Sequence, residues 1–439
     1  MPASETKSCP AIVITAPASN QGKTMVTAAL ARFHRDQRMK VKVFKTGPDF
    51  LDPMILEQAS GQTVDHLDLW MVGESLCRQR LFKAAGENDL IIVEGVMGLF
   101  DGDPSTADLA RLFNIPVAAV IDASGMAQTL AAVSYGLAKF EPELNYLGTI
   151  ANRVASERHA QMLTAGFDQG TSKSGLRFLG SLSQDKEISL PSRHLGLVQA
   201  QEIEDLDKRI HAASIAIGKT ELANLPPKVE FSAATGEPVE RHLAGKKIAV
   251  AKDNAFAFTY HANLELLEEM GATLSYFSPL KDEVFGEVDC LYLPGGYPEL
   301  YLDELSQNQR SKERIQDHAK EGGAIYAECG GMLYLLDSLT DSEGKRADLV
   351  GLIPGNASMQ KRLSALGHQY LNTEHGILRG HTFHYSKLDS TITPATSARR
   401  KTDDQPGEHF YELGNIRASY LHLYFPTNPK AAASLFGND

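Results

Sequence analysis

Short, almost uninterrupted apolar runs recur through the first half of the chain. Helix-length segments separate them, and the runs are AIVITA (11–16), VKVFKT (41–46), LIIVEG (90–95), PVAAVIDA (116–123) and YLGTIANR (146–153). Strands that are apolar on both faces are typical of a parallel sheet that helices cover on each side. We therefore predict βαβ units with right-handed crossovers, which is an α/β fold.

The second half of the chain predicts another α/β domain, and 439 residues are enough for two. The segment 223–245 mixes prolines, small residues and charges without a strand or helix period, so we expect a linker there. It would separate a first domain, residues 1–222, from a second domain, residues 246–439. Strands followed by tight turns, with one helix between them, are predicted in the second domain at KIAVAKD (247–253), ANLELLEEMGA (262–272, the helix), VDCLYLPGG (288–296) and GAIYAECGG (323–331).

Composition excludes several classes of protein. The chain has 43 basic and 55 acidic residues, a net charge of −12, which argues against wrapping nucleic acid. The longest apolar run, 117–137, is interrupted by polar residues and does not predict a membrane span. The four cysteines are scattered, and the N-terminus lacks the pattern of a signal peptide. We expect a cytoplasmic protein with small-molecule partners. The oligomeric state stays open, and a homodimer is compatible with the sequence.

The first apolar run leads directly into PASNQGKT (17–24), which ends like a phosphate-binding P-loop. Backbone amides and a helix N-terminus bind phosphate oxygens, a lysine adds positive charge, and a threonine hydroxyl can bind Mg²⁺. Pro17 replaces the usual first glycine, and Asn20 can adopt the left-handed conformation that a glycine would supply. We expect a nucleotide site at Asn20, Gln21, Gly22, Lys23 and Thr24.

Carboxylates follow the next two strands, in KTGPDFLDP (45–53) and EGVMGLFDG (94–102). Taken singly, each carboxylate is as readily explained as a helix cap or a solvated turn residue. In an open parallel sheet, however, ligands bind beyond the carboxyl ends of the strands, where these segments meet the P-loop. Mg²⁺ prefers oxygen ligands, so the expected metal site is Thr24, Asp49 and Glu94.

A second constellation centres on Cys329, which follows an apolar strand and precedes two glycines and a helix. This order is typical of a nucleophile elbow, where neighbouring amides stabilise an oxyanion. We expect the helix N-terminus to lower the pKa of the thiol. His422, in SYLHLYFPTNP (419–429), is the predicted base. The expected oxyanion site comprises Gly295, Gly296 and Gly330.

The order of these motifs resembles one known family over nearly the whole chain. The P-loop variant, GPDFLDP, EGVMGLFDG, PGGYPE, AECGGMLYL, GHTFHYS and SYLHLYF are similar to the cobyrinate a,c-diamide synthases of cobalamin biosynthesis. The resemblance implies a P-loop domain like that of dethiobiotin synthetase, joined to a class I glutamine amidotransferase domain. It implies that glutamine acylates Cys329, with His422 as base, and that ammonia passes internally to the first domain. There, MgATP phosphorylates a corrinoid carboxylate, and ammonia displaces the phosphate.

The resemblance also assigns further residues. It implies that the acetate side chains of the corrinoid lie near Asp49, Phe50, Leu51 and Asp101, that Glu94 binds Mg²⁺, that Lys45 belongs to the ATP site, and that Asn152 lies near the adenine. Two departures concern the second domain. Tyr424 stands where the family often has a second histidine and where class I amidotransferases have a glutamate. Thr382 stands where a glutamate is common, so His384 and its neighbours are weak candidates for a role.

Alternatives remain at this stage. The same chemistry could act on metal-free hydrogenobyrinate or on nickel-sirohydrochlorin. A different class, the partitioning and septum-site ATPases, shares deviant P-loops and works as nucleotide switches, but it lacks a cysteine amidotransferase domain. Because the resemblance implies a polycarboxylate substrate and the chain is acidic, we also expect basic residues to face the substrate, with Lys45, Arg153 and Arg193 as the candidates.

Overall fold

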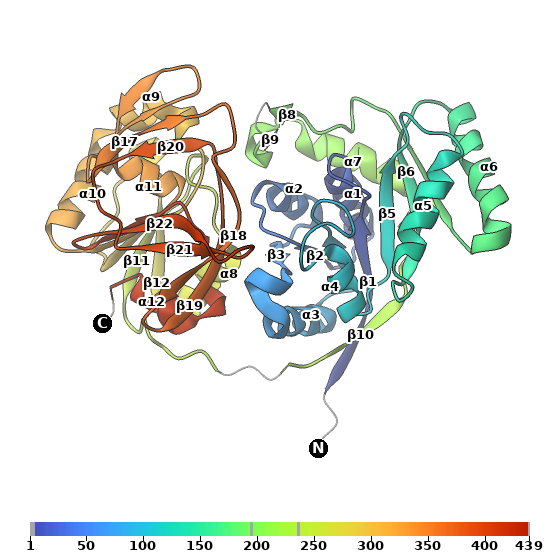
Figure 1. The fold of residues 1–439 in the computed structure, drawn as a ribbon, viewed down its shortest axis with the longest axis horizontal. Helices are drawn as coiled ribbons and strands as arrows, with labels where there is room; N and C mark the ends of the chain where they lie inside the picture. Colours follow the sequence, from blue (N-terminus) through green and yellow to red (C-terminus); the bar gives the residue numbers. More distant parts are fainter. Residues whose placement is uncertain (1–4, 194–195, 235–237, 438–439) are drawn as a thin grey trace. The chain divides into compact units, whose positions relative to one another are not determined.

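The computed structural model describes residues 5–193, 196–234 and 238–437, and the side chains of 169–174, 192–193 and 196–197 lie outside that description. The side chain of Arg193, one of the expected basic residues, therefore lies outside the described residues. The chain divides into two compact units, Met1–Gly236 and Glu237–Asp439 (Figure 1). Each unit has its own sheet and its own hydrophobic core.

The first unit is built on a parallel sheet with the strand order β3-β2-β4-β1-β5-β6-β7. All five predicted strands are present, and the α/β fold is confirmed. The strands are β1 (Thr6–Thr15), β2 (Val41–Lys45), β3 (Asp65–His66), β4 (Leu90–Glu94), β5 (Val117–Asp122), β6 (Tyr146–Val154) and β7 (Phe178–Ser183). A separate hairpin consists of β8 (Ser192–Arg193) and β9 (Gly196–Leu197).

Helices cover both faces of this sheet (Figure 1). Successive side chains of a strand point to opposite faces of the sheet, so each face has its own core. Val120 belongs to the core beneath α1, α2 and α7, and its neighbour Ile121 belongs to the core beneath α5 and α6. The helices are α1 (Lys23–Asp36), α2 (Leu51–Ser60), α3 (Glu74–Glu87), α4 (Thr106–Leu112), α5 (Thr129–Phe140), α6 (Glu157–Ser174) and α7 (Leu206–Ile217). This two-sided burial is the reason for the nearly continuous apolar strands.

The segment expected to be a linker, 223–245, contains a strand that the sequence did not predict. Strand β10 (Lys228–Ser232) pairs antiparallel with the beginning of β1, outside the parallel part of the sheet. Its side chains alternate between exposed and buried, with Val229 and Phe231 buried. Five residues of such alternation, next to two prolines, are too short a signal to separate from irregular structure.

The second unit combines a parallel half-sheet with an antiparallel one, in the order β12-β11-β13-β14-β23-β22-β21-β18-β19-β24. The three predicted strands are confirmed as β11, β13 and β14 of the parallel part. Its other two strands, β12 and β23, and the antiparallel part were not predicted. The strands are β11 (Lys247–Ala251), β12 (Thr273–Phe277), β13 (Cys290–Leu293), β14 (Ala324–Glu328), β18 (Ala365–Thr373), β19 (Gly376–His384), β21 (Thr396–Arg400), β22 (Pro406–Leu413), β23 (Ile416–Ser419) and β24 (His422–Leu423).

A smaller sheet and several α-helices belong to the described part of the second unit. The sheet has the order β16-β15-β17-β20, and its strands are β15 (Leu336–Thr340), β16 (Arg346–Asp348), β17 (Ile353–Met359) and β20 (Ser386–Asp389). The helices are α8 (His261–Glu269), α9 (Leu302–Gln307), α10 (Gln309–Lys320), α11 (Gly330–Leu335) and α12 (Pro429–Ser434). Helix α8 confirms the predicted helix.

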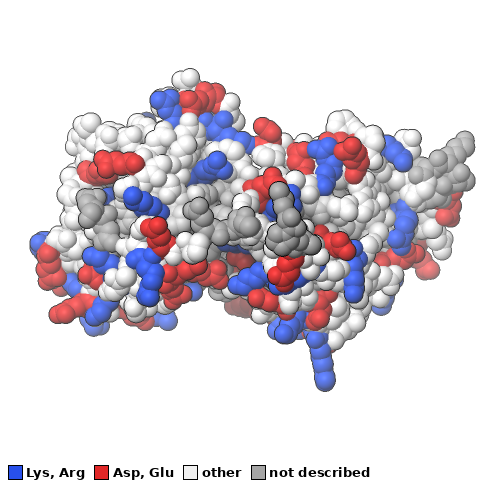
Figure 2. Space-filling model, turned by 90° about the horizontal axis from the view of Figure 1, so that it is seen from below, with Lys and Arg blue, Asp and Glu red and all other residues white. Residues whose placement is uncertain are grey.

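Two surface properties bear on the expected partners. Acidic and basic side chains are interspersed over the face shown in Figure 2. Among the described residues, every helix is too short or too polar to cross a bilayer.

Candidate active sites

The P-loop lies between β1 and α1, as the sequence predicted, and two of its residues have left-handed backbone conformations. Asn20 has φ 62, which confirms that it takes the conformation a glycine would supply, and Gly22 has φ 92. A Cβ at Gly22 would lie 2.2 Å from Nδ2 of Asn152, so the loop needs glycine there for space as well. The same Asn152 amide donates to the carbonyl of Gln21 at 2.9 Å. The end of β6 thereby holds the loop.

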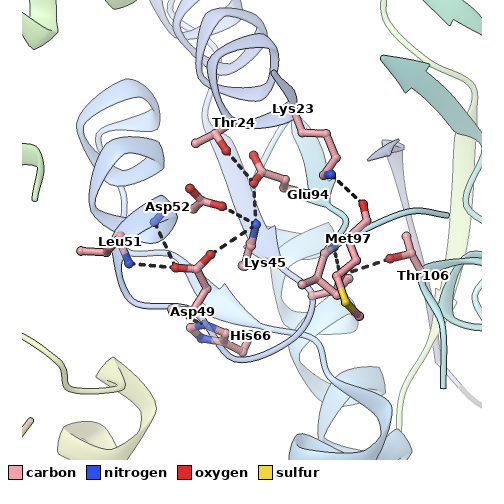
Figure 3. A network of polar contacts seen from close by, with 12 residues as sticks. Lys23, Thr24, Lys45, Asp49, Leu51, Asp52, His66, Glu94, Met97 and Thr106 are labelled. Carbon is pink, nitrogen blue, oxygen red and sulfur yellow. Dashed lines mark hydrogen bonds and ion pairs between the residues drawn. The ribbon is translucent and has the colours of Figure 1, made fainter. Parts of the chain in front are cut away.

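Lys23 begins α1 and bends back over its own loop. Its ammonium donates to the carbonyl oxygens of Ala18, at 3.2 Å, and Met97, at 2.6 Å (Figure 3). Burial, followed by the positive charge of Lys45, lowers the pKa of Lys23 to about 8. An anion bound in the loop would favour the charged form of this lysine and raise its pKa again.

Lys45, at the end of β2, lies at the centre of a carboxylate cluster (Figure 3). Its ammonium is 2.6 Å from Asp52, 2.6 Å from Glu94 and 3.6 Å from Asp49. Burial opposes its charge, but these three carboxylates raise its pKa well above the usual value. The acids of the two predicted segments therefore do converge, and a buried ammonium joins them. The Lys45 ammonium thus points into this cluster of carboxylates.

Glu94, at the end of β4, connects this cluster to the P-loop. Its Oε1 accepts from Lys45 and, at 3.2 Å, from the hydroxyl of Thr24. Its Oε2 is buried and has no hydrogen-bond partner among the described residues. Burial raises the pKa of the Glu94 carboxyl, and Lys45 opposes that rise. An unpartnered carboxylate oxygen beside a P-loop hydroxyl fits a hard cation such as Mg²⁺, which binds proteins through one or two carboxylates.

Asp49 precedes α2, and one of its carboxylate oxygens accepts hydrogen bonds from the first amides of that helix. Its Oδ1 accepts from the amides of Leu51, at 2.9 Å, and Asp52, at 3.2 Å, while Oδ2 faces Lys45. Burial and the charge of Asp52 raise the pKa of Asp49, and Lys45 opposes them. The structure thus brings Asp49, Phe50 and Leu51 to the start of α2, beside Lys45.

Two other predicted site residues, Asp101 and Arg153, make their contacts outside the Lys45 carboxylate cluster. Asp101 accepts from the amide of Gly98 at 2.9 Å and so holds the turn after β4. Arg153 pairs with Asp122, and its side chain is 43% exposed. Of the two described candidates for a basic substrate contact, Arg153 is therefore the exposed one, whereas Lys45 is buried.

In the second unit, Cys329 lies between β14 and α11 in a rare backbone conformation. Its φ is 43 and its ψ is −107, and its amide donates to the carbonyl of Ser419 at 2.7 Å. Such a conformation costs about 1–3 kcal/mol for a residue other than glycine, and it persists only where the surroundings impose it. The sharp turn after a buried strand is the geometry of the predicted nucleophile elbow.

The expected lowering of the thiol pKa is wrong. Burial, followed by the nearby carboxylates of Glu299, Glu408 and Glu328, raises the pKa of Cys329 well above its usual range, although the Gly330 amide opposes the shift. Helix α11 has only six residues, so its dipole is weak against burial. Burial, followed by His384, lowers the pKa of His422 to about 3. In the free protein, both Cys329 and His422 are therefore neutral.

The structure brings His422 and the three predicted oxyanion glycines together. A Cβ at Gly295 would lie 2.2 Å from Cε1 of the His422 ring, so glycine allows the imidazole to pack on the backbone. A Cβ at Gly330 would lie 2.7 Å from the carbonyl oxygen and 2.8 Å from the nitrogen of Gly296. The loop after β13 therefore contacts both the elbow and the imidazole.

Sequence reasoning gave little weight to two histidines of β19 that lie at this site. His381 is buried, and its ring stacks on His422 with 5.0 Å between the centroids. His384 is bound to Glu408, at 3.0 Å, and Thr382 donates to the same carboxylate oxygen at 3.1 Å. A glutamate from β22 thus lies next to both Thr382 and His384. The motif GHTFHYS was the only available signal.

Both units match families of known proteins. Residues 12–198 match the CobQ/CobB/MinD/ParA nucleotide binding domain, and residues 247–430 match the CobB/CobQ-like glutamine amidotransferase domain. The first unit is therefore a nucleotide-binding domain and the second a glutamine amidotransferase domain.

Relatives cover the whole chain. The chain is 53% identical to the hydrogenobyrinate a,c-diamide synthase of Pseudomonas aeruginosa, over 97% of each chain. It is 53% identical to the protein of the same name from Stutzerimonas stutzeri, over 98% of this chain and 99% of the relative. It is also 48% identical to the cobyrinate a,c-diamide synthase of Herminiimonas arsenicoxydans, over 99% and 98%. The chain therefore belongs to the family of cobyrinate and hydrogenobyrinate a,c-diamide synthases.

Proposed function

We propose that the chain converts the a and c acetate carboxylates of a corrinoid acid into amides, with ATP and glutamine as co-substrates, in the cytoplasm. One observation carries this proposal: relatives named for a,c-diamide synthesis match the chain over at least 97% of its length, so both units are included. We assign ATP-dependent synthesis to residues 1–222 and glutamine hydrolysis to residues 246–439. The geometry of each unit supports its half of the reaction.

Glutamine hydrolysis uses Cys329 and His422. The Cys329 sulfur attacks the side-chain amide of glutamine while His422 takes the thiol proton, and His422 then gives a proton to the departing ammonia. Water hydrolyses the resulting thioester to glutamate and regenerates the thiol. Amides of Gly295, Gly296 and Gly330 stabilise the oxyanion. The packing of His422 on Gly295, and of Gly330 on Gly296, supports these roles.

Carboxylate activation uses the first unit. The loop residues and Lys23 hold the phosphates of ATP, Asn152 lies near the adenine, and Lys45 orients the acidic groups. Thr24, Asp49 and Glu94 would hold Mg²⁺, which neutralises phosphate charge when it is bound. The γ-phosphoryl group passes to the substrate carboxylate, and ammonia then displaces phosphate from the acyl phosphate. Asp49, Phe50, Leu51 and Asp101 contact the acetate side chains. The unpartnered Oε2 of Glu94 beside Thr24 supports the metal site.

The metal content of the substrate divides the relatives. The two at 53% identity are named for hydrogenobyrinate, which is metal-free, and the one at 48% for cobyrinate. We therefore propose hydrogenobyrinate as the preferred acceptor and cobyrinate as the second. Competition between equal amounts of the two, followed by mass spectrometry, gives the ratio of their kcat/KM values. A ratio that favours cobyrinate would reverse this preference.

The amidation assay tests the function as a whole. Purified protein is given MgATP and either acceptor, with glutamine or ammonium as donor, and mass spectrometry counts the amides formed. Wild type is expected to form the diamide from both donors, and Cys329→Ala only from ammonium. If neither corrinoid reacts, the substrate assignment fails, and nickel-sirohydrochlorin is the next acceptor to assay. If Cys329→Ala still uses glutamine, the assignment of the nucleophile fails.

A further inference from the structure

The imidazole of His422 contacts a backbone segment and a second imidazole. Gly295 lies at the Cε1 edge of the ring, where a Cβ would come within 2.2 Å of Cε1. The His381 ring stacks on His422, with centroids 5.0 Å apart and ring planes 18° apart. Both histidines are buried. The His422 ring is therefore confined by its packing.

The stack is built into the sheet. Strands β19 and β24 run antiparallel, and His381 and His422 are direct partners in their register. Directly opposed residues have Cβ atoms about 4.5–5.5 Å apart on the same face of a sheet. Backbone pairing thus places the two rings side by side before any side-chain hydrogen bond is considered.

The His381 ring is itself fixed by aromatic residues. Its Nδ1 is 3.0 Å from the hydroxyl of Tyr260. The Tyr260 ring meets Tyr424 edge to face, at 5.2 Å and 76°. Tyr424 is fully buried and lies two residues after His422. Its side chain thus belongs to an aromatic group that supports His381.

A second stack holds the same segment two residues earlier. His384 and Tyr420 lie face to face, with centroids 3.7 Å apart and an interplanar angle of 7°. His384 is fixed by the carbonyl of Ser386 and by Glu408, each at 3.0 Å. Both histidines of β19 therefore stack on the segment that contains the predicted base.

We propose that His381 is a positioning residue that orients the His422 imidazole by ring stacking. The inference rests on the proposed glutaminase role of Cys329 and His422. A general base must lie within hydrogen-bond reach of the proton it takes, so free rotation of the ring would slow proton transfer. The stack on His381 and the contact with Gly295 limit that rotation.

Two variants separate ring stacking from hydrogen bonding. His381→Gln offers a polar group to Tyr260 but has no ring to stack. The double variant His381→Phe with Tyr260→Phe keeps a ring in the stack and removes the hydrogen bond between these two side chains. His409→Gln is the matched control, because His409 is an exposed histidine of the same unit whose ring nitrogen bonds Ser397.

The measurement is the kcat and KM of glutamine-dependent amidation, with ammonium-dependent amidation assayed in the same preparations. We expect His381→Gln to lower kcat for glutamine by about 10²-fold, the loss expected from misplacing a catalytic group by ~1 Å, with little change in KM. The kcat of the double variant for glutamine should stay within about tenfold of the wild-type value. The kcat of His409→Gln should equal that of wild type. Ammonium-dependent rates should be unchanged in all three variants.

Two results would overturn the inference. One is a His381→Gln variant with a kcat close to that of wild type. The other is a double variant that loses as much as His381→Gln, because stacking would then not be the property that matters. Failure of the proposed function itself has a different signature, since Cys329→Ala would then keep its glutamine-dependent activity.

Discussion

Nζ of Lys45 lies 2.6 Å from Oε1 of Glu94, and the two side chains are 3% and 0% exposed. Asp52 binds the same ammonium at 2.6 Å. One buried cation thus holds together the acidic groups of two strand ends. Removing one partner of a buried ion pair leaves an uncompensated charge, which is more costly than the net value of the pair.

Replacing Lys45 with methionine should therefore destabilise the first unit by about 3–5 kcal/mol, because two buried carboxylates lose their counter-charge. Denaturant unfolding followed by the fluorescence of Trp70, the single tryptophan of the chain, measures this unit. Arg177→Met is the control, since Arg177 and Glu221 form a pair that is more than half exposed, and it should cost about 0–1 kcal/mol. Equal effects of the two substitutions would show that the cluster is not structural.

Gly295→Ala should strongly reduce the rate of glutamine-dependent amidation but preserve ammonium-dependent amidation. The new Cβ would lie 2.2 Å from the His422 ring, so the imidazole must move. We expect glutamine-dependent kcat to fall by about 10²-fold or more. Gly286→Ala serves as the control, because a Cβ there meets nothing within 4 Å. A normal glutamine-dependent rate in Gly295→Ala would contradict the assigned position of the base.

Gly22→Ala should impair amidation from glutamine and amidation from ammonium equally, in contrast to Gly295→Ala. The added Cβ would clash with Asn152 at 2.2 Å, and φ 92 is strained for alanine, so the loop cannot keep its shape. The expected result is loss of ATP binding, measured by calorimetry, together with loss of amidation from glutamine and ammonium. Gly136→Ala, with open space around its Cβ, should bind ATP normally. ATP binding by Gly22→Ala at wild-type affinity would remove the P-loop assignment.

Alkylation of Cys329 in the free protein should show no thiolate of low pKa. Burial and neighbouring carboxylates raise the pKa of the thiol above its usual value of 9.0, so the thiol is protonated at neutral pH, and its thiolate fraction grows as pH rises. The rate of iodoacetamide labelling at Cys329, followed by peptide mass spectrometry, should still increase with pH above pH 9. A plateau below about pH 7.5 would instead indicate an activated thiolate.

Local sequence was sufficient for the elements and loops that carry the chemistry. Most of the parallel strands were predictable because two-sided burial leaves continuous apolar runs, and the P-loop and elbow because each is a short strand–turn–helix pattern. The parallel strands β3, β7, β12 and β23 were not predicted. Strand β10 and the antiparallel part of the second sheet were missed. These strands are half-exposed and carry a weak periodic signal, and several of their pairings join segments that are distant in the sequence.

The sequence by itself determined which residues of each site could do chemistry, since Lys23, Thr24, Glu94, Cys329 and His422 follow from residue type and local pattern. Only the tertiary structure decided their contacts and their pKa values in the free protein. It placed the Lys45 ammonium among the carboxylates, and it stacked His381 on His422. It also reversed the expected shift of the Cys329 pKa. Burial and contacts between distant segments set these properties, and neither can be read from a local pattern.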